Sequence, residues 1–237
     1  MLFLSGLFFL ILINLIGFYL ENGHVLRTIF PLFIPVFFSY FFFKFKKLSI
    51  LFITFLIFSL FADISAFVNW SFLKGNTTNI FSILSYISLI LFILPKFKLV
   101  KTQNLVNTYF VFVLTIAIYF VCTVHLKLHE FIEDNINITF ITLKIVTLVV
   151  LSFIALNVYF NEDSKPNVLF LTSVICLVFS AFLNFVNGYY LYNLSFVILE
   201  GIFYLLGIYL LFKSVVSDKQ IESYGLYKKN VSKNIYI

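Results

Sequence analysis

The sequence predicts an all-α integral membrane protein with eight transmembrane helices, and three observations lead to this prediction. Hydrophobic residues make up 62% of the 237 positions, while charged residues make up 11%. Apolar runs recur along almost the whole chain, and the lysines gather in alternate loops between them. A helix needs about 20 apolar residues to cross about 30 Å of hydrocarbon, so the spans use most of the chain and leave little for a soluble domain.

Eight apolar runs are the expected spans. The first has no basic residue ahead of it and no small-residue cleavage site after it, so we interpret it as a retained helix and not as a signal peptide. The second, with Pro31 and Pro35, and the fourth are the shortest, and the third, sixth and eighth each hold one charged residue. In order, the spans are Leu2–Leu20, Ile29–Phe43, Leu48–Leu73, Ile80–Leu94, Val106–Val124, Ile138–Phe160, Val168–Tyr190 and Leu194–Phe212.

The positions of the lysines orient these spans. The loops after the second, fourth and sixth spans, together with the C-terminal segment, hold twelve lysines, whereas the opposite loops hold only Arg27, Lys74 and Lys127. Cytoplasmic loops carry the excess of Lys and Arg in membrane proteins, so both termini are expected in the cytoplasm, in agreement with an even number of spans. The expected organisation is one membrane domain over residues 1–213 and a basic cytoplasmic tail over residues 214–237.

The chain also matches itself at an offset of 118 residues. Positions 51–69 are identical to positions 169–187 at 8 of 19 places, including Thr54 with Thr172 and Asn69 with Asn187. The match predicts two parallel four-helix repeats, over about residues 1–101 and 102–213, and sites tend to form between such halves. The counterpart of Asp63 is Ala181, so the two halves differ chemically.

Polar groups inside the spans are the candidate functional residues. An ionised side chain in hydrocarbon costs several kcal/mol, so it needs a partner or a function. Asp63 lies in the third span, and Lys144 and Glu200 lie within about two helical turns of the outer surface, so the three could meet in one pocket. By helical spacing, we expect the pocket also to include Ser59, Asn69, Asn184, Asn187 and Tyr204.

A purely structural role is the alternative for these charges. They could form a paired cluster that fixes the register of the bundle, with Lys144 reaching the membrane interface. His125 and His129 lie close to acidic residues in the expected outer loop, and we interpret that segment as a polar surface loop, so no metal and no cofactor is expected. Membrane lipids are the expected partners, nucleic acid is not, and nothing in the sequence sets an oligomeric state.

Two short motifs carry a family resemblance. Phe61-Ala62-Asp63 resembles a motif in the third span of the YhhN family of eight-span lysoplasmalogenases, and Phe179-Ser180-Ala181 resembles the family's second motif except that its Asp is replaced by Ala181. The segment Tyr204–Leu210 is similar to the last helix of the family. The resemblance implies hydrolysis of the vinyl ether bond of lysoplasmalogens by two carboxylates.

In this chain Asp63 would be the first catalytic carboxylate. Glu200 is the only other carboxylate within an expected span that could replace the missing Asp, so the expected acid–base pair is Asp63 and Glu200. Ala181 leaves an alternative open from a different class, a non-enzymatic small-solute transporter or lipid-binding scaffold. The composition, rich in Phe, Ile, Asn, Lys and Tyr, is that of an AT-rich genome, and the expected location is a bacterial inner (plasma) membrane.

Overall fold

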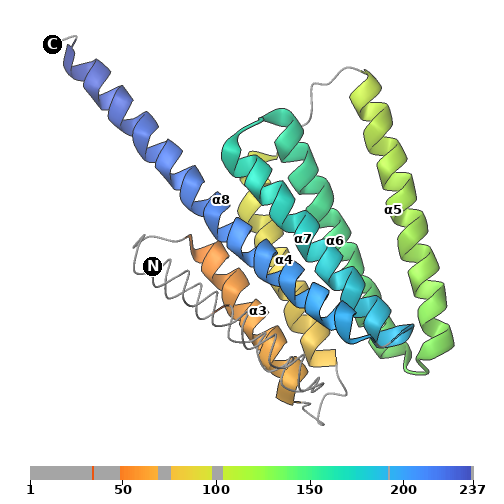
Figure 1. The fold of residues 1–237 in the computed structure, drawn as a ribbon. Helices are drawn as coiled ribbons and strands as arrows, with labels where there is room; N and C mark the ends of the chain where they lie inside the picture. The colour runs from red at the N-terminus through yellow and green to blue at the C-terminus, as the bar shows by residue number, and fades with distance from the viewer. Residues whose placement is uncertain (1–33, 35–48, 69–75, 98–103, 192, 236–237) are drawn as a thin grey trace.

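The computed structural model describes residues 34, 49–68, 76–97, 104–191 and 193–235. Within these ranges the chain is built from helices joined by short turns (Figure 1). Five of the helices are long and apolar enough to cross a membrane, and the apolar part of α3 is shorter. In chain order the elements are α3 (Ile50–Val68), α4 (Asn76–Ile93), the 3-10 turn η2 (Leu94–Lys96), α5 (Asn104–Phe131), α6 (Asn135–Asn161), α7 (Lys165–Tyr189) and α8 (Leu194–Ile235).

These helices coincide with the third to the eighth expected spans. The first two expected spans, the prolines of the second and residue Asn69 of the third lie outside the described residues. The total of eight spans therefore stays a prediction.

Two helices end later than the apolar runs indicated. α5 continues to Phe131 and not to Val124, so His125 and His129 lie on its last two turns and not in a loop. α8 continues to Ile235, so the segment expected as a tail extends the same helix. Polar residues do not by themselves end a helix, and no proline follows the apolar run in either segment to stop it.

A capping side chain begins α6 and a proline lies at the start of α7, at the two tight turns that follow α5 and α6. The Asp134 carboxylate accepts a hydrogen bond of 3.0 Å from the Ile136 backbone N–H at the start of α6. Pro166 lies in the first turn of α7. Backbone N–H groups in the first turn of a helix have no intrahelical acceptor, so a proline, which lacks the N–H, costs no hydrogen bond there. These turns make α5, α6 and α7 antiparallel neighbours in sequence order (Figure 1).

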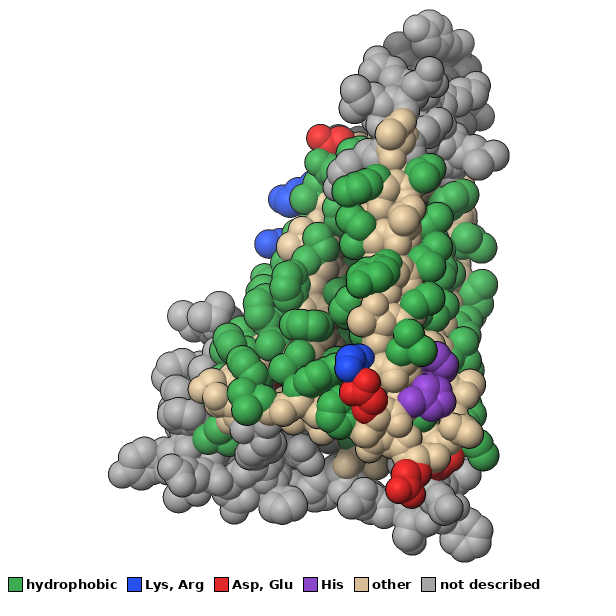
Figure 2. Space-filling view, turned by 90° about the vertical axis from the view of Figure 1, so that its right-hand side faces the viewer, with side chains coloured by type: hydrophobic (Ala, Val, Ile, Leu, Met, Phe, Trp, Pro, Cys, Tyr) green, Lys and Arg blue, Asp and Glu red, His purple; other side chains and the backbone are tan. Residues whose placement is uncertain are grey.

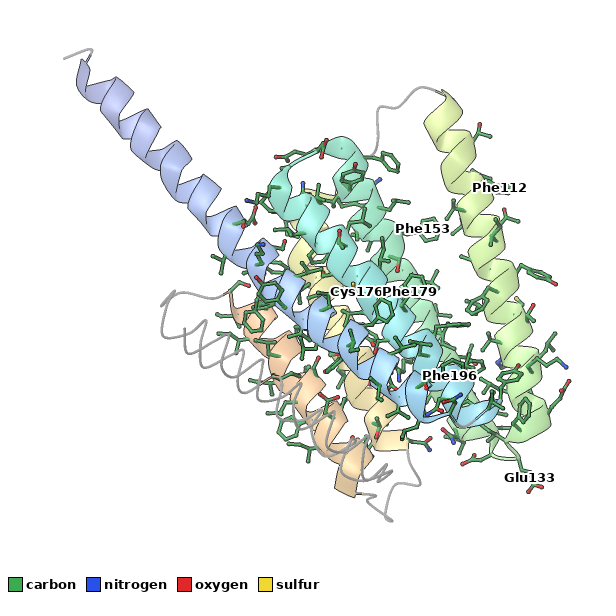
Figure 3. All side chains as sticks on the ribbon, in the orientation of Figure 1. Phe112, Glu133, Phe153, Cys176, Phe179 and Phe196 are labelled. Atoms are coloured by element: carbon green, nitrogen blue, oxygen red, sulfur yellow. The ribbon has the colours of Figure 1, made fainter. Side chains whose placement is uncertain are left out.

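Two helical hairpins and one central helix form the bundle. α3 packs along α4, α7 packs along α8, and α6 contacts both α4 and α7. α5 contacts α6 near the C-terminal end of α5, through Val124 and Leu128 against Ile138 and Ile141. The other end of α5 stands apart from α6 (Figure 1), and Phe112 there is 63% exposed (Figure 3).

The two ends of the bundle differ in packing and in charge. We call the end at which α4 finishes and α7 begins the basic end, because Lys96, Lys165 and Lys213 lie there. Lys96 forms an ion pair with Asp218, and the Ser214 hydroxyl donates to the Pro166 carbonyl at 2.7 Å, which holds α4, α7 and α8 together there. The opposite end, where α7 finishes and α8 begins, is the cavity end.

Aromatic and branched side chains fill the basic end of the bundle. The rings of Phe52 on α3 and Phe212 on α8 meet edge to face, with centroids 5.0 Å apart. Both rings are fully buried in a single hydrophobic core. The core also includes Phe55, Leu56, Leu89, Ile93, Leu148, Leu151, Phe170, Val174, Leu177, Ile208 and Leu211. Buried hydrophobic side chains therefore pack closely at the basic end of the bundle.

Hydrophobic side chains dominate the outer surface. Figure 2 shows them over most of the described part of one face, with charged and histidine side chains near its two ends. This distribution fits a protein whose middle is surrounded by hydrocarbon and whose ends reach the interfaces. The described helices are thus those of an integral membrane protein.

Serines on α4 satisfy their own hydroxyl groups. Ser82, Ser85 and Ser88 each donate to a backbone carbonyl three or four residues earlier, at 2.7–2.8 Å. A hydroxyl satisfied in this way costs little in an apolar environment, and its small side chain lets a neighbouring helix approach closely. α4 can therefore lie between α3 and α6 although it is rich in polar residues.

The Gly207→Val substitution is expected to separate α7 from α8. A Cβ atom at Gly207 would lie 3.1 Å from the Leu177 side chain and 3.2 Å from the Ser173 carbonyl, whereas nothing lies within 4 Å of a Cβ at Gly188. Overpacking of this kind costs about 1–3 kcal/mol. Thermal unfolding in detergent should therefore show a lowered midpoint for Gly207→Val and an unchanged one for Gly188→Val. Equal midpoints for the two variants would contradict this account of the α7–α8 contact.

Candidate functional site

A cavity occupies the part of the bundle between the hydrophobic core and the cavity end. Its volume is about 380 Å³, and α3, α4, α6, α7 and α8 all contribute to its wall. This volume lies within the range of small-molecule sites, about 300–1,000 Å³. The lining residues are Phe55, Ser59, Ala62, Asp63, Ala66, Thr78, Asn79, Ser82, Ser85, Tyr86, Lys144, Leu177, Ser180, Ala181, Asn184, Asn187, Gly188, Val197, Glu200 and Tyr204.

The cavity extends deep into the bundle. Thr78 lies in the first turn of α4 at the cavity end, and Tyr86 lies eight residues further along. At about 1.5 Å per helical residue, the cavity wall on α4 is about 12 Å deep. Phe55 and Leu177, which belong to the hydrophobic core, form its apolar floor. The site thus combines a polar wall with an apolar base.

Asp63 is held by a tyrosine from the other hairpin. The Tyr204 hydroxyl on α8 donates a hydrogen bond of 2.8 Å to Oδ2 of Asp63 on α3. This bond and the Phe52–Phe212 ring pair connect α3 with α8. A hydrogen bond of this kind contributes about 0.5–1.5 kcal/mol, and about 1.5–3 kcal/mol when one partner is charged. The interaction therefore joins the two hairpins and fixes the carboxylate at the cavity wall.

Glu200 lies over α7. The Asn184 side chain of α7 donates to Oε1 of Glu200 on α8. Asn184 is three residues after Ala181, so the two lie on the same face of α7, one turn apart. The Glu200 carboxylate is therefore held next to the part of α7 at which Ala181 contributes only a methyl group to the cavity wall.

Lys144 supplies the positive charge of the site. It lies on α6, lines the cavity, and interacts electrostatically with Glu200 and, less strongly, with Asp63. Asp63 and Glu200 also interact electrostatically with each other. Three charged side chains from three different helices thus share one cavity inside an apolar bundle.

Most of the residues that the sequence singled out lie at this one cavity. Ser59, Asp63, Lys144, Asn184, Asn187, Glu200 and Tyr204 all line it, and Asn69 lies outside the described residues. Their roles as catalytic or substrate-binding groups stay predictions. Asn187 has a structural contact as well, because its Oδ1 accepts a hydrogen bond of 2.8 Å from the Asn193 backbone N–H and so holds the turn between α7 and α8.

Sequence reasoning missed the contribution of α4. Thr78, Asn79, Ser82, Ser85 and Tyr86 line the cavity, although none was a candidate. Serine, asparagine and tyrosine are common throughout this chain, so their presence in a span was no clear signal. The indications available were the alignments of Ser82 with Glu200 and of Tyr86 with Tyr204 at an offset of 118 residues.

Positions 118 residues apart line the cavity in pairs. In each pair one member comes from the α3–α4 hairpin and the other from the α7–α8 hairpin. The pairs are Ser59 and Leu177, Ala62 and Ser180, Asp63 and Ala181, Ala66 and Asn184, Asn79 and Val197, Ser82 and Glu200, and Tyr86 and Tyr204. The internal match in the sequence therefore coincides with a shared site.

Comparison of the chain with known protein families, with curated proteins and with solved structures gives no match. Among the described residues, no group of three or more His, Cys, Asp and Glu side chains could hold a metal ion. The chemistry of the site is therefore inferred from the cavity and its side chains.

Replacing either partner of the Asp63–Tyr204 hydrogen bond is expected to destabilise the protein in a coupled way. In a double-mutant cycle with Asp63→Asn and Tyr204→Phe, the coupling free energy should be about 1 kcal/mol or more, because the two groups are in direct contact. Unfolding in detergent provides the measurement. Tyr119→Phe is the matched control, since Tyr119 on α5 is 73% exposed, and its cycle with Asp63→Asn should be additive. Additivity in the Tyr204 cycle would mean that the bond contributes nothing to stability.

Proposed function

We propose that the protein binds a lipid-like molecule in this cavity and hydrolyses the vinyl ether bond of lysoplasmalogen-type lipids. The observation that supports this function best is that two carboxylates from different helices, Asp63 and Glu200, line one intramembrane cavity. A pair of carboxylates in different environments can divide acid and base roles between them. The short motifs around Asp63 and Ser180 that resemble the YhhN family point to the same chemistry.

We further propose that the cavity end faces outward across a bacterial plasma membrane. The basic end carries Lys96, Lys165 and Lys213, and the excess of Lys and Arg marks the cytoplasmic side. The expected eight spans place both termini on that side. A lysolipid would then reach the cavity from the outer half of the bilayer.

A duplicated four-helix unit accounts for the layout of the site. The α3–α4 hairpin of one unit and the α7–α8 hairpin of the other supply the paired lining positions. Parallel repeats meet around an axis along the membrane normal, with binding sites between them. The paired positions favour this origin for the cavity over a chance match of apolar residues.

The proposed reaction needs one acid, one base and one water molecule. The acid protonates the vinyl carbon that does not carry oxygen, and positive charge develops on the oxygen-bearing carbon and its oxygen. Water adds to that carbon while the base accepts its proton. The hemiacetal then breaks its bond to the glycerol oxygen, which takes the proton held by the base, while the hemiacetal hydroxyl gives its proton back to the acid. A fatty aldehyde and a free hydroxyl group are released, and both carboxyl groups return to their starting states. Nothing is oxidised or reduced overall.

The surroundings of the carboxylates assign the two roles. Lys144 interacts more strongly with Glu200 than with Asp63, and a neighbouring cation favours the ionised form of a carboxylate. Glu200 is therefore the base and Asp63 the acid. Tyr204 donates to Oδ2 of Asp63, which leaves Oδ1 to carry the proton that is transferred.

Glu200 also compensates for the absence of a carboxylate at Ala181. The hydrogen bond from Asn184 holds Glu200 against α7, one turn from Ala181. A carboxylate reaching across from α8 can thus occupy the region that an Asp at position 181 would occupy. Ala181 equally favours a second candidate, a non-enzymatic protein that binds or carries its ligand, because half of the family-like acid–base pair is missing from α7.

The single substitutions Asp63→Asn and Glu200→Gln are expected to lower fatty-aldehyde release from a lysoplasmenyl lipid by about 10²–10⁴-fold, the usual contribution of a general acid or base. Asp163→Asn and Glu162→Gln are matched controls, because both residues are exposed in the turn before α7. Their rates should equal that of the wild type. No release by the wild-type protein at any pH, with ligand binding retained, would leave the non-enzymatic candidate in place of the hydrolase.

Restoring a carboxylate at position 181 is expected to rescue the Glu200 variant. Ala181→Asp combined with Glu200→Gln should recover at least about tenfold in rate over Glu200→Gln alone, because a general base contributes about 10²–10⁴-fold and part of that returns with the new carboxylate. Asp63→Asn should gain nothing from Ala181→Asp, since its acid is still missing. Rescue of Asp63→Asn and not of Glu200→Gln would contradict the assigned roles.

A further inference from the structure

Two hydrogen-bond donors at the cavity wall have no partner among the described residues. The Tyr86 hydroxyl and the Lys144 ammonium both line the cavity, and neither forms a hydrogen bond or an ion pair with any residue that the structure describes. Tyr86 lies close enough to Asp63 to interact with it electrostatically, as Lys144 does. The two donors therefore lie around the same carboxylate, on α4 and α6.

Several other polar groups of the site already have partners. Asp63 receives a hydrogen bond from Tyr204, and Glu200 receives one from Asn184. Thr78 and Ser65 bond to each other at the rim, and Ser82 and Ser85 bond to their own helix. Lys144 and Tyr86 are thus donors that remain available to a ligand, and they favour a ligand that is rich in acceptors.

Charge points in the same direction. With the proton of the proposed acid on Asp63, Glu200 is the carboxylate that interacts with the Lys144 charge, and the Lys144 ammonium still has no hydrogen-bond acceptor among the described residues. An ammonium group carries three donors and no acceptor, and an uncompensated donor in an apolar environment is costly. A ligand oxyanion beside Lys144 and Tyr86 would use these donors, and charge-assisted hydrogen bonds are about twice as strong as neutral ones.

We propose that Lys144 and Tyr86 form a subsite for a phosphate group of the ligand, beside the Asp63–Glu200 pair. The proposal rests on the cavity being the binding site of the proposed function and adds the chemistry of the headgroup to it. The phosphate of a lysolipid and a free phosphate ester present the same oxyanion, so the ligands in the test must distinguish the two sources.

Binding is measured with the full-length protein in a maltoside detergent, which contains no phosphate. Four probes are compared, a monoacylglycerol phosphate, the monoacylglycerol with the same acyl chain, glycerol 3-phosphate and inorganic phosphate. We expect the monoacylglycerol phosphate to bind at least about tenfold more tightly than the neutral lipid, since a hydrogen bond to a charged group is worth about 1.5–3 kcal/mol. Binding of inorganic phosphate or glycerol 3-phosphate as tight as that of the lysolipid would support the subsite and identify its source as a soluble phosphate.

The variants Lys144→Met and Tyr86→Phe should each remove most of this preference. We expect Lys144→Met to weaken binding of the phosphate lipid by about 10–100-fold and Tyr86→Phe by about tenfold, with little change for the neutral lipid. Lys127→Met and Tyr119→Phe are the matched controls, because Lys127 pairs with Glu130 on the surface and Tyr119 is exposed on α5. If Lys144→Met does not fold, Lys144→Gln keeps a polar side chain and removes the charge.

Two results would overturn the proposal. One is equal affinity of the wild type for the phosphate lipid and its neutral counterpart, and the other is a preference that survives in Lys144→Gln and Tyr86→Phe. Neither depends on aldehyde release. A protein that shows the preference without hydrolysis retains the subsite and loses the proposed reaction, whereas hydrolysis without the preference retains the reaction and loses the subsite.

Discussion

The absence of water from hydrocarbon is the constraint on which this structure depends. A polar side chain inside the bundle must find its hydrogen bonds within the protein or with a group bound in the cavity. The serines of α4 use the backbone of their own helix, Asp63 uses Tyr204, and Glu200 uses Asn184. Because the serine hydrogen bonds stay within α4, this helix can pack against α3 on one side and α6 on the other. The hydrogen bonds to Asp63 and Glu200 tie α8 to α3 and to α7, so the same bonds that remove the cost of the carboxylates also determine where the cavity lies.

The sequence could predict which segments are helical but less well where they end. Apolar runs indicated the third to the eighth spans, because the length and composition of such a run can be read directly from the sequence. The ends of α5 and α8 depended on side chains such as His125 and Lys213, which tolerate a helix as well as a loop. Nothing in an apolar run distinguishes a helix that stops at the interface from one that continues into water.

The sequence identified the site residues whose side chains are costly in free energy to place in hydrocarbon, and it missed those that hydrocarbon accepts more easily. Asp63, Lys144 and Glu200 stood out because a charge in hydrocarbon needs a reason, and all three line the cavity. Tyr86 and Thr78 carry no such cost, and in a chain with 14 tyrosines a single one in a span means little. Their place in the site depends on how α4 is rotated against α3 and α6, which is a property of packing that no local pattern in the sequence records.

The paired lining positions have a consequence for how a molecule sits in the cavity. Asp63, on the first helix of one hairpin, is paired by the offset of 118 residues with Ala181, and Glu200, on the second helix of the other hairpin, is paired with Ser82. Each hairpin thus contributes one carboxylate, Asp63 from the first helix of its hairpin and Glu200 from the second helix of the other. A cavity with exact two-fold symmetry would accept a bound molecule in two equivalent orientations. The displaced carboxylate removes that equivalence, so an amphiphile with unlike ends meets unlike walls and has one preferred direction of entry.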